Sequence, residues 1–164
     1  MAALSCPRCR STHVRPSSRH GAVEVALSYA YVYPFRCQIC RSRFRRFRPG
    51  ERYVPIKLDR RDYERLSCNV WTALAWRQWR SQGRVVDISI AGCSLETDAT
   101  IQVGELVALL MEPEDVPPVV VDVAEVRSVV NGRVGLKFVK MEHEHEERLA
   151  DLVTSLLTSP KRPK

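Results

Sequence analysis

The 164-residue sequence lacks any long uninterrupted apolar run. Its longest apolar-looking stretch, residues 22–35, is broken by Glu24 and Ser28 and is shorter than the roughly 20 residues that a helix needs to span a bilayer. Residues 1–5 offer neither a charged leader nor an apolar segment, so Cys6 is not expected to be a processed lipoprotein cysteine. We therefore expect no transmembrane segment and a cytoplasmic location.

The sequence also lacks a recognisable catalytic arrangement. Ser89 stands two residues after Asp87, but no histidine is placed to complete a nucleophilic site with them. Cys68 and Cys93 lie in strand-like sequence, where a cysteine usually packs in the core. The sequence therefore predicts a protein that is not an enzyme.

Biased tracts and internal repeats are absent, and a hydrophobic content of 45% is typical of a globular chain. The net charge of +7 is unevenly distributed. Residues 1–57 carry twelve basic and two acidic residues, a net +10, whereas residues 58–164 carry 14 basic and 17 acidic residues, a net −3. This asymmetry predicts an anionic partner for the N-terminal part, which would be nucleic acid, acidic lipid or another protein.

Four of the six cysteines form two C-x-x-C pairs, Cys6 with Cys9 and Cys37 with Cys40. In a chain without a signal peptide such pairs favour a metal over disulfides, and zinc is the metal that four cysteines usually bind. Four thiolates leave no open position for water, so the zinc would be structural. The alternative is a set of reduced structural cysteines or a redox pair. The pattern predicts a small zinc-ribbon-like module over residues 1–50, in which residues 22–31 fit either a short helix or a hairpin.

Arginines alternate with Phe44 and Phe47 over residues 41–48. Basic and aromatic residues in such a run can bind single-stranded nucleic acid by phosphate pairing and base stacking. The favoured interpretation is that the two phenylalanines form the small core of the module and the arginines its solvated face. Pro49 and Gly50 then end the run, and residues 51–59 are predicted to be a linker.

Short β-strand patterns separated by turn signals fill most of residues 60–158. We expect turns at Ser81–Gly83 and at Asn131–Gly132, and an interruption of strand pairing by the proline-rich residues 112–118. An amphipathic helix is predicted over residues 142–157, followed by a basic tail at 159–164. The chain is therefore predicted to be mainly β, with a closed antiparallel barrel of about six strands and a C-terminal helix.

Two groups of polar residues stand out in this region. Asp87 and Ser89 project from the same face of a predicted strand, and Gly92 allows a turn or the close approach of a ligand to the backbone. Arg61 and Arg65, four residues apart, carry planar charged groups suited to phosphate and guanine.

Together these residues form the pattern R-x-x-x-R, 22 residues before the Asp of D-x-S-x-x-G. This pattern resembles the signature of the PilZ domain, a bacterial receptor for cyclic di-GMP, and the resemblance covers about residues 58–157. It implies a six-stranded barrel that binds cyclic di-GMP. The residues that would bind the ligand are Arg60, Arg61, Arg65, Asp87, Ser89 and Gly92. In that family the arginines lie on an arm before the first strand and wrap the ligand.

The leading hypothesis is a cyclic di-GMP effector or adaptor in bacterial second-messenger signalling, with the zinc module contacting a protein partner. The alternative is a nucleic-acid-binding zinc-ribbon protein in which the barrel is only structural. A third possibility is a degenerate PilZ domain that serves as an adaptor without ligand. Retention of Arg61, Arg65, Asp87, Ser89 and Gly92 favours the first over the third.

Overall fold

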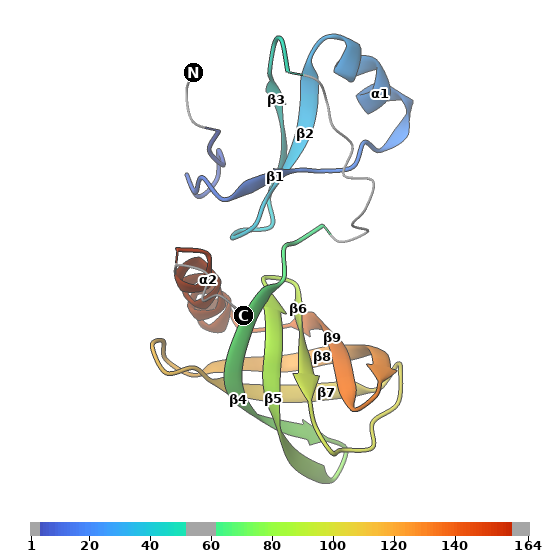
Figure 1. Ribbon diagram of the computed structural model, residues 1–164, viewed down its shortest axis with the longest axis vertical. Coiled ribbons are helices and arrows are strands. Elements are labelled where there is room, and N and C mark those ends of the chain that lie inside the picture. Colours follow the sequence, from blue (N-terminus) through green and yellow to red (C-terminus); the bar gives the residue numbers. More distant parts are fainter. Residues whose placement is uncertain (1–3, 52–61, 159–164) are drawn as a thin grey trace. The chain divides into compact units, whose positions relative to one another are not determined.

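A computed structural model describes residues 4–51 and 62–158 (Figure 1). The chain divides into two compact units, Met1–Glu64 and Arg65–Lys164. The division places Asp62, Tyr63 and Glu64 with the first unit, although they lie beyond the module boundary that the sequence predicts at residue 50. No helix within residues 4–51 and 62–158 is long and apolar enough to cross a membrane.

Within its described residues, 4–51 and 62–64, the first unit is a three-stranded antiparallel sheet with one helix. Its strands are β1 (Val14–Pro16), β2 (Val32–Cys37) and β3 (Arg43–Phe47), with β2 in the centre. The stretch that the sequence leaves undecided is a helix, α1 (Gly21–Tyr29), which follows β1 and contacts β2 (Figure 1). Because β1 pairs with β2, the sheet brings the two C-x-x-C pairs close together.

Aromatic side chains form only part of the core predicted for this unit. Tyr33 and Phe35 of β2 are buried, and the Phe35 ring stacks on Phe44 at 6.1 Å between centroids. Phe47 is 63% exposed, so its predicted core role is wrong. Its place at the end of β3, opposite Val32, leaves it beyond the buried part of the sheet.

A buried carboxylate connects the helix to β3. Glu24 of α1 is 2% exposed and accepts hydrogen bonds from Arg43 at 2.6 and 2.7 Å and from Arg45 at 3.0 and 3.1 Å. The hydrogen bond from Arg43 is the main reason why the pKa of Glu24 falls from its ordinary 4.5 to about 2. Arg43 and Arg45, which alternate on one face of β3, therefore have a structural role rather than a purely solvated one.

We expect Glu24→Gln to destabilise the first unit by about 3 kcal/mol, because the two guanidinium groups would lose their buried counter-charge. The folded pKa lies below the ordinary value, so the carboxylate stabilises the unit above about pH 4.5. This stabilisation is lost as the pH falls from 4.5 towards 2. Amide hydrogen exchange of β2 and β3 at neutral pH measures the loss.

The matched control is Glu51→Gln. Glu51 pairs with Arg48 at 2.7 Å, but its side chain is 42% exposed. An exposed pair of this kind contributes about 0–1 kcal/mol. Equal losses for the two variants would contradict the role given to Glu24.

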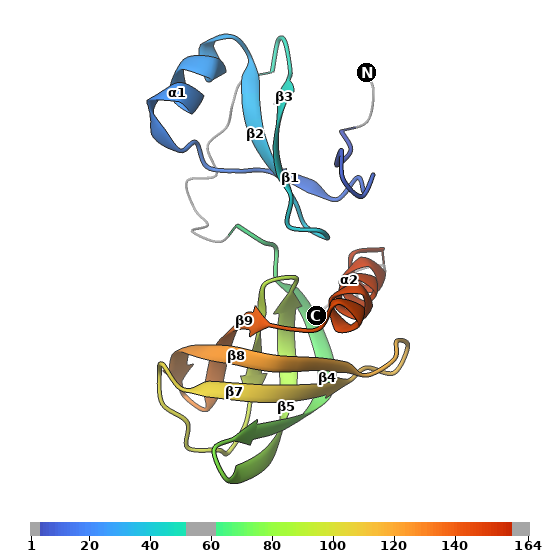
Figure 2. The ribbon, with the colours of Figure 1, turned by 180° about the vertical axis from the view of Figure 1, so that it is seen from behind.

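The second unit is a closed barrel of six antiparallel strands, as the sequence predicts, with strand order β4-β5-β6-β9-β8-β7 (Figures 1 and 2). Every neighbouring pair around the barrel is antiparallel, and the inward-facing residues are almost entirely aliphatic. The strands are β4 (Leu66–Trp76), β5 (Trp79–Ser89), β6 (Gly92–Glu96), β7 (Leu106–Glu112), β8 (Val119–Val130) and β9 (Arg133–Lys140).

The inner face of β4, which the sequence leaves open, consists of Val70, Thr72 and Leu74. Helix α2 (His143–Thr158) follows β9 within one residue of the predicted start and packs against β8 and β4. Leu149, Leu152 and Val153 are the buried residues of this helix, as its apolar periodicity indicates.

One predicted turn is correct and another is wrong. Asn131 and Gly132 both have positive φ, 49° and 73°, as a tight hairpin between β8 and β9 requires. The turn predicted at Ser81–Gly83 lies instead at Arg77–Gln78, between the paired residues Trp76 and Trp79. Gly83 belongs to the interior of β5, where an added Cβ would lie 2.8 Å from the carbonyl oxygen of Glu96. Its glycine serves close strand packing rather than a turn.

Candidate ligand-binding site and metal centre

The residue that begins the second unit, Arg65, lies directly before β4 and contacts the two following strands of the barrel. Its Nη1 donates to Oδ1 of Asp87 in β5 at 2.8 Å and to the hydroxyl of Ser94 in β6. The side chains of Arg65 and Asp87 remain 28% and 20% exposed. The structure therefore joins one arginine and the aspartate of the predicted motif in a charge-assisted pair that solvent still reaches.

Strand register explains why these residues converge. Asp87 lies opposite Ser67 on one side and opposite Ser94 on the other. Ser94 was not predicted from the sequence as a site residue, although a signal was available. The β5–β6 turn closes at Ser89 and Gly92, and counting back two pairs from this closure reaches Asp87 and Ser94.

Ser89 is held inside this tight turn. It is 5% exposed, its hydroxyl donates to the carbonyl oxygen of Gly92 at 3.1 Å, and it accepts the N–H of Ala91 at 3.4 Å. These bonds give Ser89 a role in shaping the turn. Its predicted contact with a guanine edge stays a prediction.

Gly92 has a packing reason to be glycine. An added Cβ would lie 2.2 Å from the carbonyl oxygen of Leu136 in the neighbouring strand β9. The backbones of β6 and β9 therefore approach too closely for any side chain at this position. Close packing of the two strands therefore requires glycine here independently of any ligand, and the close approach of a ligand to Gly92 stays a prediction.

Gly92→Ala is expected to destabilise the barrel by about 2–4 kcal/mol, because the methyl group forces two hydrogen-bonded strands apart. Gly104→Ala is the control. Nothing lies within 4 Å of a Cβ there, and only the φ of +90° resists the change, so we expect a loss of about 1 kcal/mol. Thermal melting of both variants measures the difference, and a smaller effect at Gly92 than at Gly104 would contradict the packing explanation.

Arg60 and Arg61, the other predicted ligand residues, lie outside the described residues. The two cysteines near the site, Cys68 and Cys93, are not activated nucleophiles. Burial raises the pKa of Cys68 to about 12, and it raises the pKa of Cys93 as well. Both thiols are therefore protonated at neutral pH, as expected for cysteines that pack in a barrel wall.

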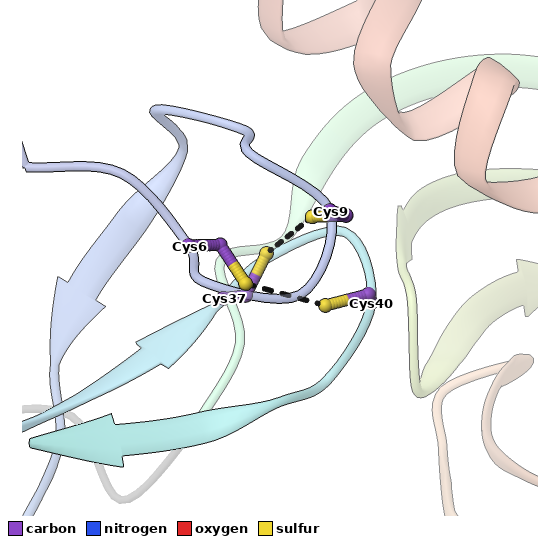
Figure 3. A group of neighbouring side chains, drawn as sticks. All are labelled: Cys6, Cys9, Cys37 and Cys40. Carbon is purple, nitrogen blue, oxygen red and sulfur yellow. Dashed lines mark hydrogen bonds between the residues drawn. The ribbon is translucent and has the colours of Figure 1, made fainter.

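The four cysteines of the two C-x-x-C pairs come together in the first unit (Figure 3). Cys6 and Cys9 lie ahead of β1, Cys37 ends β2, and Cys40 lies in the turn to β3. All four sulfur atoms lie within 4.8 Å of one another, with Cys6–Cys40 and Cys9–Cys37 separations of 3.5 Å. Sulfurs around a tetrahedral ion with bonds of ~2.3 Å are ~3.8 Å apart, so this cluster has the dimensions of a four-thiolate metal site.

The pKa shifts within the cluster also favour a bound cation. Burial raises the pKa of Cys37, and it raises the pKa of Cys40 to about 12. Burial likewise opposes ionisation of Cys6, but amide N–H groups of Cys9 and Arg8 outweigh it and lower the pKa to about 7. Four thiolates at this spacing would repel one another, and a divalent cation is the group that stabilises all of them together.

The PilZ domain family model matches residues 59–155, which is more than half of the chain. The chain therefore belongs to the PilZ domain family, as its motif predicts.

Solved structures of similar fold include the PilZ domain with c-di-GMP of YcgR from Escherichia coli. It is 19% identical, with a TM-score of 0.51, over 60% of this chain and 92% of that chain. YcgR from Escherichia coli in complex with c-di-GMP is 16% identical, with a TM-score of 0.53, over 88% of this chain and 73% of that one. The Bacillus subtilis inhibitor of motility (MotI/DgrA) is 16% identical, with a TM-score of 0.55, over 80% and 70%. No curated protein matches the chain.

Proposed function

We propose that this protein is a cyclic di-GMP-binding effector whose ligand site lies where Arg65 meets Asp87 at the start of β4. The observation that carries the proposal is this pair, at 2.8 Å, in a chain of the PilZ family. The two Escherichia coli structures of similar fold contain the same nucleotide, which supports the choice of ligand. The protein binds and reports a nucleotide in this proposal, and it is not an enzyme.

The chemistry of the residues suits a cyclic dinucleotide. Cyclic di-GMP carries two phosphates, and each guanine offers the N7 and O6 acceptors that a guanidinium fork recognises. Arg61 and Arg65, with Arg60 as a further donor, supply these forks. Asp87 orients Arg65 and accepts from the guanine N–H edge, while Ser89 and Gly92 shape the turn beside it. The arginines before β4 attract the phosphates of the ligand, and the strand residues provide selectivity for the base.

In the same proposal Cys6, Cys9, Cys37 and Cys40 hold one structural zinc. The unit around it has a small core, so the metal stabilises a module that apolar burial alone supports poorly. Its net positive charge suits an acidic surface on a protein partner. In this proposal the protein acts in bacterial second-messenger signalling in the cytoplasm.

The nucleic-acid alternative depends on the arginines of residues 41–48. Two of these, Arg43 and Arg45, bind the buried Glu24 and so are committed to the fold. This pairing reduces the charge that the run offers to phosphates. Salt-dependent nucleic-acid binding that disappears in Arg46→Ala would revive the alternative.

Ligand-induced thermal stabilisation tests the proposed function. A ligand at 100 times its Kd stabilises the folded state by about 2.7 kcal/mol, so cyclic di-GMP should raise the melting temperature of the barrel by several degrees. Cyclic di-AMP is the control because it keeps both phosphates and lacks the guanine O6. Equal stabilisation by both nucleotides would show phosphate binding without the proposed base recognition, and no stabilisation by either would remove the proposed function.

A further inference from the structure

The three residues between the motif arginines are held by other residues of the first unit. Asp62, Tyr63 and Glu64 follow Arg61 directly and precede Arg65, and they belong to the first unit. Gln38, which is only 4% exposed, binds their backbone with both ends of its amide. Its Nε2 donates to the Asp62 carbonyl at 3.3 Å, and its Oε1 accepts the Glu64 N–H at 2.7 Å. One buried side chain thus fixes the backbone of residues 62–64, which we call the arm, at two points.

Arg36 holds the side chains of the same segment. Its guanidinium lies 5.4 Å from the centre of the Tyr63 ring and donates to the Tyr63 hydroxyl at 3.0 Å. It also lies 3.5 Å from the Asp62 carboxylate. Arg15 adds a longer pair with Glu64 at 3.7 Å. We call these contacts of Arg15, Arg36 and Gln38 with residues 62–64 the arm clasp.

The arm clasp is built on the metal centre. Gln38 is the residue between Cys37 and Ile39 in the second C-x-x-C pair, and its own N–H donates to the carbonyl of His13 at 2.9 Å. The Ile39 N–H donates to the Cys37 sulfur at 3.4 Å, as in a folded cysteine knuckle. Gln38 can therefore reach the arm only when the knuckle that binds the metal is folded.

We infer that the arm clasp makes ligand binding at Arg65 depend on the metal-loaded state of the first unit, with Gln38 and Arg36 as positioning residues. The inference rests on the proposed function. It adds a regulatory input that the barrel motif by itself does not contain.

The physical basis is preorganisation. A free arm samples many backbone conformations, and ordering it on a ligand costs conformational entropy. The clasp orders part of the arm before the ligand binds, so less conformational entropy is lost on binding. If loss of the clasp reduces the competent arm population to about one tenth, the apparent Kd rises about tenfold, since it varies inversely with that population.

The test measures cyclic di-GMP affinity by calorimetry for the full chain and for Gln38→Met. Methionine keeps most of the volume of Gln38 and removes both arm hydrogen bonds. We expect binding about five- to twentyfold weaker. Gln78→Met, the same exchange at an exposed turn position of the barrel, is the control and should bind like wild type.

Tyr63→Ala breaks the clasp from the side of the arm and should weaken binding to a similar degree. This variant keeps the test valid if Gln38→Met disturbs the module. Metal content and the hydrogen exchange of β2 and β3 show whether each module is folded. In wild type the Glu64 amide should be protected from exchange, and Gln38→Met should remove that protection.

Chelation supplies the decisive comparison. Removing the metal from wild type should weaken binding by about the same factor as Gln38→Met, and removing it from Gln38→Met should add little, because the two changes break one linkage. Equal affinity of metal-loaded and metal-stripped wild type would overturn the inference while leaving the proposed function intact. An absence of cyclic di-GMP binding to metal-loaded wild type would overturn the proposed function itself.

Discussion

Removal of the metal is expected to unfold the first unit and to leave the barrel folded. The described core of this unit includes Tyr33, Phe35, Cys6 and Cys37, and two of these four residues belong to the proposed metal site. Binding of a structural zinc by four deprotonated thiols stabilises small modules by about 10–16 kcal/mol at neutral pH. The barrel has its own aliphatic core, so the loss should be confined to residues before Arg65.

Metal analysis of protein purified under reducing conditions, followed by hydrogen exchange with and without a chelator, checks this expectation. One zinc per chain is expected. Cys9→Ser should abolish metal binding, whereas the control Cys68→Ser should retain it, because Cys68 lies in the barrel wall and donates to the Val85 carbonyl. A metal-free preparation whose first unit is nonetheless protected from exchange would refute the structural role of zinc.

Arg65→Ala is expected to weaken cyclic di-GMP binding by about 1.5–3 kcal/mol, or roughly tenfold to more than a hundredfold, as for loss of a charge-assisted hydrogen bond. The barrel should lose only about 1 kcal/mol of stability, since the Arg65–Asp87 pair is partly exposed. Lysine at this position should restore part of the affinity, because it keeps the charge and loses the planar fork. Calorimetry and thermal melting separate the two effects.

Arg77→Ala is the matched control. Arg77 follows the other end of β4 and pairs with Glu105 at 3.1 Å, with its own side chain 77% exposed, so the change removes the same charge and an ion pair of similar length away from the proposed site. Its affinity for the nucleotide should equal that of wild type. Similar weakening by the two variants would mean that net charge, rather than the geometry at Arg65, governs binding.

Features encoded by local chemistry were predictable from the sequence. The Asn131–Gly132 hairpin depends on two residues that tolerate positive φ, and α2 depends on an apolar stripe of helical period. The spacing of the C-x-x-C pairs likewise predicts the cysteine cluster. The barrel follows from the number and alternation of the strands, supported by the family motif.

Features that depend on partners far along the chain were not predictable. Helix α1 buries Glu24 rather than an apolar stripe, so it has no periodic signal, and its partners Arg43 and Arg45 are 19 and 21 residues away. Gly83 resembles a turn residue, but its environment comes from the carbonyl of Glu96. These positions are determined by tertiary packing.

The same limit applies to the site. The motif predicted Arg65 and Asp87, and the turn closure could have given Ser94. Gln38 carried no signal, because its partners, Asp62 and Glu64, lie 24 and 26 residues further along the chain. The arm clasp became visible only in three dimensions.

A calorimetric titration of the metal-loaded protein with cyclic di-GMP tests the central claim most directly. We predict saturable binding with a Kd of about 1 μM or tighter, and its loss in the Arg61→Ala, Arg65→Ala double variant. An absence of binding to the folded wild-type protein at ligand concentrations of about 100 μM, or unchanged binding by the double variant, would contradict the claim.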